Sequence, residues 1–546
     1  MNNYLRLLIV ILILNIVSST QIIKSDSLKH EKIKKNILVN VFPGGRSHNF
    51  VLKSLFDHSL DHQKDFEYVY HILVHNTDKT AWPSDEPYKI YGYGNVTFYE
   101  QVFSLALEEV QKDPVFGFGQ FNYAMKQTLE EFINSGLIIE FEKIKFDMLI
   151  TDIPNFISVF AREHFNIEHS VYLSPPSVPN VFFNLFELNS GILPAMGSNF
   201  FDVMSFKERF INFFFINGMK IIYRMFMDDH VKIFQKYGYH LKNTCAHIYD
   251  SFFMVQYPVG LFFNISLPPN IVKLNAITPR PSNPIKDTDP RLDEFLNLYK
   301  KNIYFSQGTI VKIIDFKSIL GVFNHFSDCG FVLAFNKNFI PEELFAELPK
   351  NILLIDWVNQ NDLLGDNRLH AFITHGGTNS VSESLYHDKP MVILGVTLDQ
   401  INTAAAANKR KVGVVYHKLE DITVENLILG LEQILKPEEE NVYLQNAKKI
   451  GRIIRFNRDA REEYTYWIDY FFRLGYKHLL VKSYIEYNGF QVQNYDVLAV
   501  MVLILIAFIL IVKKLFLCMF CSCKATKNRF KHGEKIDSAK LLNHKQ

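Results

Sequence analysis

The sequence predicts an α/β protein in which two doubly wound parallel sheets face each other across a cleft, followed by a C-terminal transmembrane helix. Three observations lead to this prediction: a strand–helix–strand pattern near the N-terminus, a second series of buried strands after residue 290, and a long apolar segment near the end. The 546 residues are too many for one ordinary core, and a composition of 48% hydrophobic and 21% charged residues is that of a globular protein. The net charge of +1 gives no reason to expect a nucleic-acid partner.

The first half of the chain alternates buried strands with helical segments. A strand is predicted over Ile37–Phe42, running into a Pro/Gly loop, and "VLKSLFDHSLDH" follows as a helix before the strand "FEYVYHILVHN". Two further strands are expected in "KFDMLITD" and "HSVYLSP". Residues 195–240 are rich in Phe and Met at helical spacing, which we interpret mainly as core and otherwise as the apolar wall of a substrate site.

The clearest break in composition is "ITPRPSNPIKDTDP", residues 277–290, where four prolines indicate a linker between domains. A second strand series follows it, in "NIYFSQGT", "FVLAFN", "NILLIDW", "AFITHGG", "PMVILGV" and "VGVVYH". Ligands of such sheets bind at the carboxyl ends of the strands, so we expect the functional residues there.

Two apolar segments predict the cellular compartment. Residues 1–20 read as a secretory signal peptide, with an uncleaved anchor helix as the alternative, and residues 495–520 as a transmembrane helix. The chain from residue 513 to its end carries nine Lys or Arg residues against two acidic ones, so the tail 521–546 is expected in the cytosol. These features predict a type I membrane protein, with glycosylation sequons at Asn95 and Asn264.

The segment "AFITHGGTNSVSES" predicts an anion site. The strand ends at Thr374, His375 and two glycines make the turn, and Asn379 and Ser380 favour the start of a helix. Glycine lets a phosphate approach the backbone, and the helix N-terminus favours negative charge. Glu383, one turn further on, suits the hydroxyls of a ribose. The alternative is a plain strand-to-helix turn.

The residues around this turn resemble a known family. Residues 357–400, "WVNQNDLLGDNRLHAFITHGGTNSVSESLYHDKPMVILGVTLDQ", resemble the donor-binding signature of the UDP-glycosyltransferases. "YFSQGT" (304–309), "YWIDYFFRLGYKHL" (466–479) and "YNGFQVQNYDVLAV" are similar to other segments of the membrane-anchored, animal-type branch. The resemblance implies a GT-B fold, with two Rossmann-like domains across a cleft, and a hexosyltransferase of EC 2.4.1 type.

The resemblance also implies roles for individual residues. Trp357 matches the position that stacks on uracil, Gln360 and Glu383 the ribose contacts, and Asp399 with Gln400 the pair that binds the sugar hydroxyls. The residues that match the diphosphate site are Ser306, Thr309, Thr374, His375, Gly377, Asn379 and Ser380. In the first domain, His48 matches the general base and Asp152 the carboxylate that orients its imidazole.

The implied reaction is an inverting displacement that needs neither a metal nor a resident cofactor, with the UDP-sugar as co-substrate. "DTD" at 287–289 is similar to the metal motif of another glycosyltransferase fold, but it lies in the linker. The chain departs from the family pattern at Asn359 and Gly395, where Pro is usual, at Asp366, where His is usual, and at Asp388, where Gly is usual. We expect Asn359 to loosen the loop beside Trp357 and Asp366 to add negative charge near the nucleotide.

The expected organisation is a signal peptide (1–20), an acceptor-binding domain (21–276), the linker (277–290), a UDP-sugar-binding domain (291–455), closing helices with a juxtamembrane segment (456–494), the transmembrane helix and the tail. The function expected is transfer of glucose or glucuronic acid to a hydroxyl of a small lipophilic acceptor, a sterol, lipid or phenol. The alternatives are a non-catalytic, membrane-tethered protein that binds nucleotide sugars or lipids, and a sugar-phosphate receptor. Endoplasmic reticulum membrane is the expected location, with the cell surface, the donor sugar and a homo-oligomeric state left open.

Overall fold

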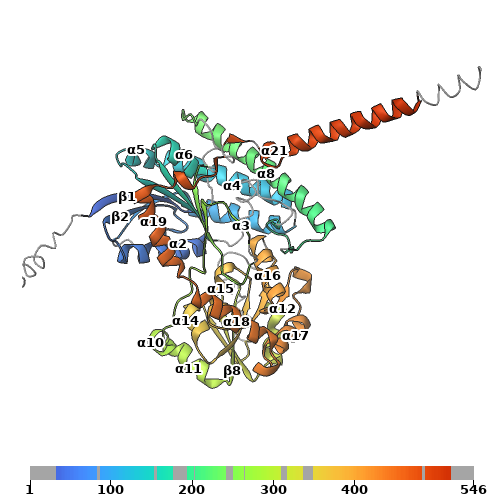
Figure 1. The fold of residues 1–546 in the computed structure, drawn as a ribbon. Helices are drawn as coiled ribbons and strands as arrows, with labels where there is room; N and C mark the ends of the chain where they lie inside the picture. Colours follow the sequence, from blue (N-terminus) through green and yellow to red (C-terminus); the bar gives the residue numbers. More distant parts are fainter. Residues whose placement is uncertain are drawn as a thin grey trace, which may run out of the picture. The chain divides into compact units, whose positions relative to one another are not determined.

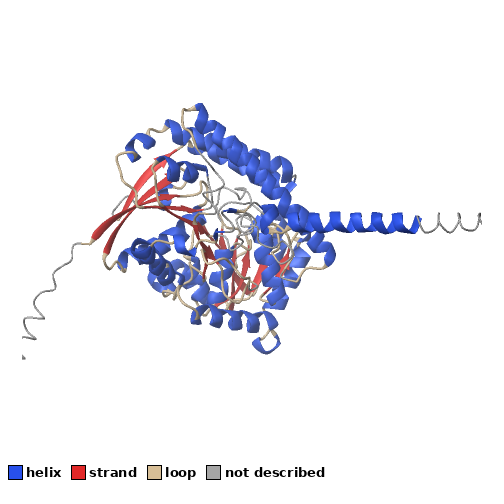
Figure 2. Ribbon diagram, turned by 45° about the horizontal axis from the view of Figure 1, so that its top comes forward, coloured by secondary structure: helices blue, strands red, loops and turns tan. Residues whose placement is uncertain are grey.

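The structure is a computed structural model that describes residues 32–82, 87–112, 114–152, 156–175, 193–201, 203–241, 250–262, 265–308, 316–335, 348–396, 398–482, 486–487 and 489–517. One compact unit extends to Val481 and contains two parallel β-sheets (Figures 1 and 2). A second unit begins at Lys482. The predicted fold class, two α/β domains followed by an apolar C-terminal helix, is confirmed.

The first sheet has seven strands in the order β3-β2-β1-β4-β5-β6-β7, and every neighbouring pair is parallel. The strands are β1 (Ile33–Asn40), β2 (Phe66–His75), β3 (Tyr88–Tyr93), β4 (Met148–Asp152), β5 (His169–Ser174), β6 (Phe252–Gln256) and β7 (Ile271–Leu274). The sequence did not indicate β3 and β7, which are short edge strands without a continuous apolar run, nor β6. The helices of this domain are α2 (Arg46–Asp61), α3 (Val96–Lys112), α4 (Pro114–Asn134), α5 (Leu137–Phe141), α6 (Phe156–His164) and α8 (Phe206–Lys236).

The second sheet has six strands in the order β10-β9-β8-β11-β12-β13, again all parallel. They are β8 (Lys301–Ser306), β9 (Cys329–Ala334), β10 (Ile352–Ile355), β11 (Leu369–Thr374), β12 (Met391–Leu394) and β13 (Gly413–Tyr416). All six coincide with the predicted apolar runs, because strands buried on both faces read as continuous hydrophobic segments. The helices are α10 (Ile285–Thr288), α11 (Pro290–Leu298), α12 (Phe316–His325), α14 (Gln360–Gly365), α15 (Thr378–Tyr386), α16 (Leu398–Arg410), α17 (Val424–Ile434) and α18 (Val442–Phe456).

Helix α19 (Ala460–Leu474) leaves the second domain and packs on the core of the first sheet. Its buried residues Ala460, Tyr464, Ile468 and Phe471 recur at intervals of three or four, so they share one helical face. This face joins the hydrophobic cluster of β1, β2 and α2, and the Tyr464 hydroxyl lies 3.3 Å from the hydroxyl of Tyr70. The end of the second domain therefore completes the core of the first.

The Phe-rich region contains one long helix, α8, but the prediction that it is mainly core is wrong for its N-terminal half. Ile216, Met227 and Phe234 are buried, whereas all five phenylalanines between 206 and 215 are exposed. The exposed side chains have the helical spacing of a core face, which is why the pattern alone did not distinguish the two environments.

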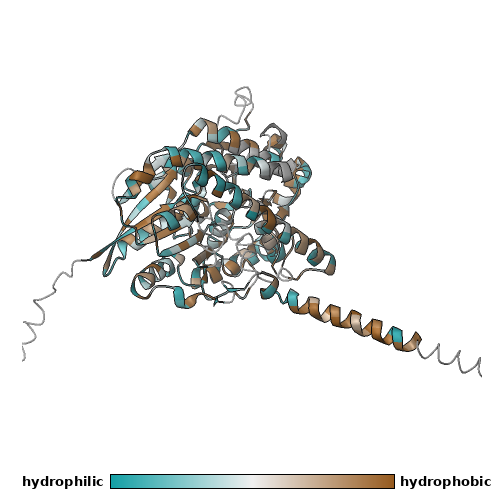
Figure 3. Ribbon diagram, turned by 90° about the horizontal axis from the view of Figure 1, so that it is seen from above, coloured by the Kyte–Doolittle hydropathy of each residue, from teal (hydrophilic) through white to brown (hydrophobic). Residues whose placement is uncertain are grey.

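Among the described residues, one helix is long and apolar enough to cross a membrane, Tyr495–Leu517 in the second unit. Figure 3 shows it as a nearly continuous hydrophobic helix. It matches the predicted transmembrane segment 495–520 up to Leu517. The expected signal peptide and the basic tail lie outside the described residues.

Tyr464→Ala should destabilise the protein by about 3 kcal/mol, because it leaves a cavity in the core that α19 completes. Thermal unfolding of the detergent-solubilised full chain would measure the loss. The matched control is Tyr466→Ala on the same helix, whose ring is exposed, and it should stay within about 0.5 kcal/mol of the parent. Equal melting temperatures for Tyr464→Ala and the parent would show that α19 is not an integral part of the first core.

Candidate active site

Two neighbouring strands of the first sheet bring His48 and Asp152 together. β1 and β4 are paired with Asn40 opposite Thr151, so the loop after β1 and the last residue of β4 meet at the carboxyl edge. His48 lies in the first turn of α2, and its Nδ1 is 2.8 Å from Oδ2 of Asp152. The Asp152 side chain is fully buried, while that of His48 keeps 18% of its surface exposed. A neutral imidazole therefore carries its proton on Nδ1 and its lone pair on Nε2.

The charges around His48 favour its protonated form. Burial by itself lowers the pKa of the imidazole, but the carboxylate of Asp152 outweighs it, with smaller contributions from Asp399 and Asp78, so the pKa is raised. Asp399 belongs to the first turn of α16 in the second domain. A charge of the second domain therefore contributes to the raised pKa of His48.

Asp78 is a member of this cluster that the sequence reasoning missed. It follows β2 at the same carboxyl edge and is almost fully buried. Its Oδ2 accepts a hydrogen bond of 2.6 Å from the backbone N–H of Gly44, which fixes the glycine turn leading to His48. Burial raises the pKa of Asp78 to about 6. The sequence pattern that could have indicated Asp78 is an acidic residue just after β2, the strand that pairs with β1.

In the second domain, β11 ends at Thr374 and α15 begins at Thr378. The turn between them needs a left-handed residue, which Gly376 supplies with φ of 87°. Thr374 is fully buried, and its hydroxyl accepts a hydrogen bond of 3.3 Å from the Gly376 N–H, so it holds the turn. Gly377 is the N-cap and has no side chain to occupy the N–H groups of the first helical turn. This terminus therefore has the geometry of an anion site.

The His375 ring fills the space that two glycines leave. A Cβ on Gly377 would lie 2.5 Å from its Nε2, and one on Gly308 would lie 2.7 Å from its Cε1. Burial lowers the pKa of His375 to about 4, so the ring is neutral near pH 7. Within the described part of the chain, its buried Nδ1 has no hydrogen-bond partner. A neutral imidazole in this position has an N–H to donate to a phosphate oxygen.

The predicted ribose residues form one hydrogen-bonded group. Gln360 Nε2 donates to Glu383 Oε2 over 2.8 Å and to Ser380 Oγ over 3.2 Å, and its Oε1 accepts from the Tyr304 hydroxyl. Burial raises the pKa of Glu383. The amide of Gln360 thus holds the side chains of Ser380 and Glu383 in place. Tyr304 also belongs to this group, although the sequence did not indicate it.

Trp357 lies in the second domain but contacts α2 of the first. Its indole is 55% exposed, with the Arg46 guanidinium 5.2 Å and the Phe50 ring 5.6 Å from it. A second link joins Gln256 at the end of β6 to Asn379 of α15, whose Oδ1 accepts a hydrogen bond of 2.9 Å. The residues predicted to bind the nucleotide are therefore connected to both domains.

The remaining predicted residues are located as follows. Ser306 ends β8, and its hydroxyl accepts from the Gly308 N–H over 3.3 Å. Asp399 and Gln400 lie in the first turn of α16. Asn95 is exposed ahead of α3, and its Oδ1 accepts from the Phe98 N–H. Thr309 and Asn264 lie outside the described residues.

Three of the four departures from the family pattern, Asn359, Asp388 and Asp366, have local explanations. Asn359 does not loosen its loop as expected, because its Oδ1 caps α14 by accepting from the Asp362 N–H. Asp388 has φ of 60°, the left-handed region that glycine occupies without steric cost, and its carboxylate forms two hydrogen bonds with Arg455.

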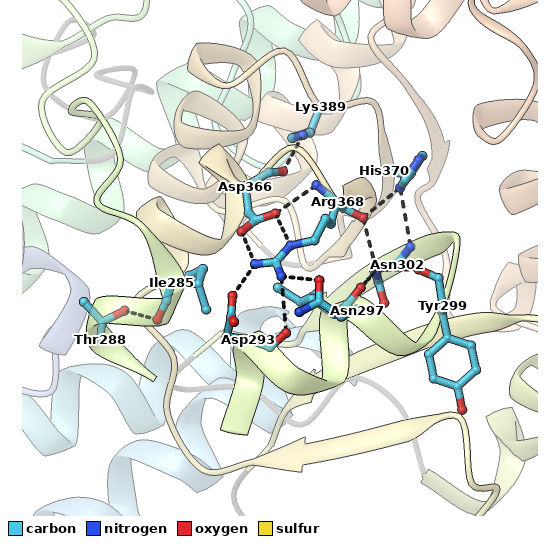
Figure 4. Close-up of polar contacts among 11 residues, drawn as sticks. Ile285, Thr288, Asp293, Asn297, Tyr299, Asn302, Asp366, Arg368, His370 and Lys389 are labelled. Atoms are coloured by element: carbon cyan, nitrogen blue, oxygen red, sulfur yellow. Dashed lines mark hydrogen bonds and ion pairs between the residues drawn. The ribbon is translucent and has the colours of Figure 1, made fainter. Parts of the chain in front are cut away.

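Asp366 does not add free negative charge to the nucleotide site. Its carboxylate is paired with Arg368, which also contacts Asp293 and Asn297 (Figure 4). These ion pairs outweigh burial and hold the pKa of Asp366 below its ordinary value. The cluster precedes β11, and the six-residue strand separates it from the His375 turn by roughly 20 Å.

The family model of "UDP-glucoronosyl and UDP-glucosyl transferase" matches residues 35–530. The chain belongs to this family. UDP-glucuronosyltransferase 2A1 of Mus musculus is 26% identical over 71% of this chain and 72% of its own length. UDP-glucuronosyltransferase 2B15 of Homo sapiens is 24% identical over 74% and 76%, and 2-hydroxyacylsphingosine 1-beta-galactosyltransferase of Rattus norvegicus 26% over 73% of each.

Solved glycosyltransferases share the fold. A UDP-glucosyltransferase from Polygonum tinctorium superposes with a TM-score of 0.54 at 13% identity, over 81% of this chain and 99% of that one. A UDP-glucose: anthocyanidin 3-O-glucosyltransferase in complex with UDP gives 0.53 at 16% identity, over 80% and 98%. The protein is thus a UDP-glycosyltransferase with the GT-B fold, an enzyme that transfers sugar from a UDP-sugar to an acceptor.

Gly377→Ala should weaken UDP binding about 10-fold, because the new Cβ displaces His375 and narrows the helix terminus, which removes roughly one charge-assisted hydrogen bond. Titration calorimetry with UDP would measure the change. Gly218→Ala is the matched control, since a Cβ there meets open space. Unchanged UDP affinity in Gly377→Ala would contradict a phosphate site at this turn.

Proposed function

We propose that this UDP-glycosyltransferase works by direct displacement with inversion, with His48 as the general base and Asp152 as the residue that orients it. The 2.8 Å contact between His48 Nδ1 and Asp152 Oδ2 carries the proposal. It leaves Nε2 as the basic atom, on a partly exposed ring that lies within the electrostatic influence of Asp399 from the donor-binding domain.

In the proposed reaction, the acceptor's proton is transferred to His48, and the electron pair of the broken bond leaves with UDP. Nε2 of His48 takes the proton of the acceptor hydroxyl as its oxygen forms a bond to the anomeric carbon. The bond from that carbon to the β-phosphate oxygen breaks, and its electron pair leaves with UDP. The N-terminus of α15 and the neutral His375 stabilise the charge that develops on the leaving group. Asp152 stabilises the imidazolium, and the scheme uses no resident metal or cofactor.

Apolar and aromatic side chains beside His48 support the proposal that the acceptor is a small lipophilic molecule. Tyr99, Ala124 and Met125 form a buried cluster, against which four partly buried side chains pack: Phe42, Val102, Phe121 and Phe156. The Phe42 ring is 6.3 Å from the His48 ring and 6.1 Å from that of Phe121. A phenol, sterol or lipid alcohol could bury its apolar body here with its hydroxyl at the base.

We propose that the donor is UDP-glucose or UDP-glucuronic acid. Asp399 and Gln400 offer the acceptors and donors that sugar hydroxyls require. Arg46, a candidate partner for a glucuronate carboxylate, lies over the Trp357 ring. Two of the relatives above are named as glucuronosyltransferases and one as a galactosyltransferase, so a donor panel has to include all three sugars.

We further propose a type I orientation in the endoplasmic reticulum membrane, with the compact unit on the luminal side. The apolar helix Tyr495–Leu517 and the lysines at 513 and 514 support this orientation. The predicted signal peptide adds to it.

The deciding experiment measures UDP release by the purified full chain with UDP-glucose, UDP-glucuronate and UDP-galactose against a panel of phenols and sterols. We expect acceptor-dependent release with at least one pair, and a decrease on the order of 10²–10⁴ in His48→Ala. The product should have the anomeric configuration opposite to the donor. If His48→Ala releases UDP as fast as the parent with every pair that is active, His48 is not the general base.

Asp152→Asn should shift the acid limb of the pH profile of kcat/KM to lower pH while lowering the maximum. A general base must be neutral, so kcat/KM rises as pH passes the pKa of His48, and Asp152 is the largest cause that raises this pKa. Asp147→Asn is the control, because Asp147 lies at the opposite end of β4, paired with Lys35. If the acid limb of the kcat/KM profile of Asp152→Asn lies at the same pH as that of the parent, Asp152 does not raise the pKa of His48.

Thr97→Ala should abolish glycosylation at Asn95 without removing the Asn95 side chain that caps α3. Expression in a eukaryotic host, followed by endoglycosidase treatment and electrophoresis, measures the loss of one glycan. A parent chain without a glycan at Asn95 would argue against a luminal location, because the sequon is exposed.

A further inference from the structure

The Pro-rich segment predicted to be a linker, residues 277–290, packs against the second domain. Ile285 is almost fully buried and belongs to the same hydrophobic cluster as Leu363 of α14. At the end of α14, a Cβ on Gly365 would lie 2.2 Å from Cβ of Ser282, so the absence of a side chain lets the linker approach the helix. The linker is therefore part of the donor-binding domain and not a loose connection between two domains.

An ion pair joins the linker to α14. The carboxylate of Asp362 is fully buried and accepts hydrogen bonds from Nη1 and Nη2 of Arg280, over 2.7 and 3.0 Å. The backbone N–H of Asn283 donates a third bond to it over 2.9 Å. Burial alone raises the pKa of Asp362, but these bonds outweigh it and hold the pKa below its ordinary value. Because a bidentate pair is directional, it fixes the orientation of the helix as well as its distance from the linker.

The amide of Asn361 adds a second connection beside this ion pair. Its Oδ1 accepts from the backbone N–H of Arg280 over 3.1 Å, and its Nδ2 donates to the carbonyl of Arg280 over 3.0 Å. The same Oδ1 accepts from Nε2 of His387, the C-cap of α15, over 3.0 Å. One amide thus connects the linker, α14 and α15.

The two connected helices carry the residues predicted to bind the ribose. Gln360 is the first residue of α14, two positions before Asp362, and it donates to Glu383 of α15 over 2.8 Å. The charges of Arg280 and Asp362 both act on the carboxylate of Glu383. Hydrogen bonds weaken steeply with misalignment, so a small rotation of α14 would disturb the contact between Gln360 and Glu383.

We propose that the linker sets how strongly the donor site recognises the ribose hydroxyls. Arg280 and Asp362 act as positioning residues, because their ion pair holds α14 in place. With α14 fixed, Gln360 keeps the Glu383 carboxylate oriented to accept from the 2′- and 3′-hydroxyls. The proposal rests on the ribose-binding role given to these last two residues, and it is independent of His48 and of the sugar transferred.

The test measures discrimination between nucleotides and needs no turnover. Titration calorimetry compares the affinity of the detergent-solubilised full chain for UDP, 2′-deoxy-UDP and 3′-deoxy-UDP. The parent should bind UDP at least about 10-fold more tightly than one of the two analogues, because a buried acceptor that loses its hydroxyl is left unpaired.

Arg280→Met should bind UDP about 10-fold more weakly, because Asp362 loses its counter-charge and α14 its fixed orientation. Its affinity for the disfavoured analogue should stay close to that of the parent, so the ratio of the two affinities falls towards one. Asp362→Asn leaves Arg280 in place but breaks the charge pair, and it should lower the ratio in the same direction.

Arg368→Met is the matched control. Arg368 also pairs with carboxylates of the second domain, those of Asp366 and Asp293, and its side chain is 30% exposed against 33% for Arg280 (Figure 4). This pair does not join the linker to α14, so the ratio should equal that of the parent. Melting temperatures of all three variants establish that each is folded.

The proposal is overturned if Arg280→Met or Asp362→Asn keeps the ratio of the parent, or if Arg368→Met loses it. Equal weakening of UDP and both analogues in Arg280→Met would also overturn it, since that result describes a contact to the base or the phosphates. If the parent itself does not distinguish the three nucleotides, the ribose-binding role of Gln360 and Glu383 is wrong, and the proposal fails with it. A parent chain that does not bind UDP would contradict the function proposed for the donor site as a whole.

Discussion

The pairing of β1 with β4 is the constraint on which the rest of the active site depends. Side chains in a strand alternate between faces, so a shift of one residue would turn Asp152 away from His48. The observed register, with Asn40 opposite Thr151, brings the fully buried carboxylate to 2.8 Å from the imidazole. A buried charge of this kind needs a partner, and the partly exposed His48 supplies one that also reaches solvent.

Polar contacts join the two sheets around this pair. Asn402 of α16 accepts from Gly197 and donates to the backbone of Ala195 and Ser198, and Gln256 donates to Asn379 of α15. Such contacts are directional, so they define where the donor-binding turn stands relative to His48. They also rest on single amide side chains and can break and reform more easily than a packed apolar core, which suits an enzyme that must admit two substrates.

The sequence predicted the architecture better than the environments of its residues. Continuous apolar runs indicated all six strands of the second sheet, because both faces of that sheet are buried. The Gly-Gly turn at 376–377 and His48 could be located because strand ends meet at one edge of a parallel sheet. Asp78 and Gln256 were missed, since a lone acid or amide carries no local pattern. The exposed phenylalanines of α8 were misjudged because periodicity shows that residues share a face without showing what that face contacts.

The return of α19 to the first sheet has a consequence for the order in which the protein is made. The first sheet begins at Ile33, but its core also requires Tyr464 and Phe471. At roughly 5–20 residues per second, translation from the end of β7 to Phe471 takes about 10–40 s, and this core stays unfinished meanwhile. During synthesis the N-terminal domain therefore waits, with apolar surface uncovered, for a helix translated after the whole second sheet. Chaperones of the compartment where the chain emerges would have to protect that surface in the meantime, and deletions near the C-terminus would impair the domain made first.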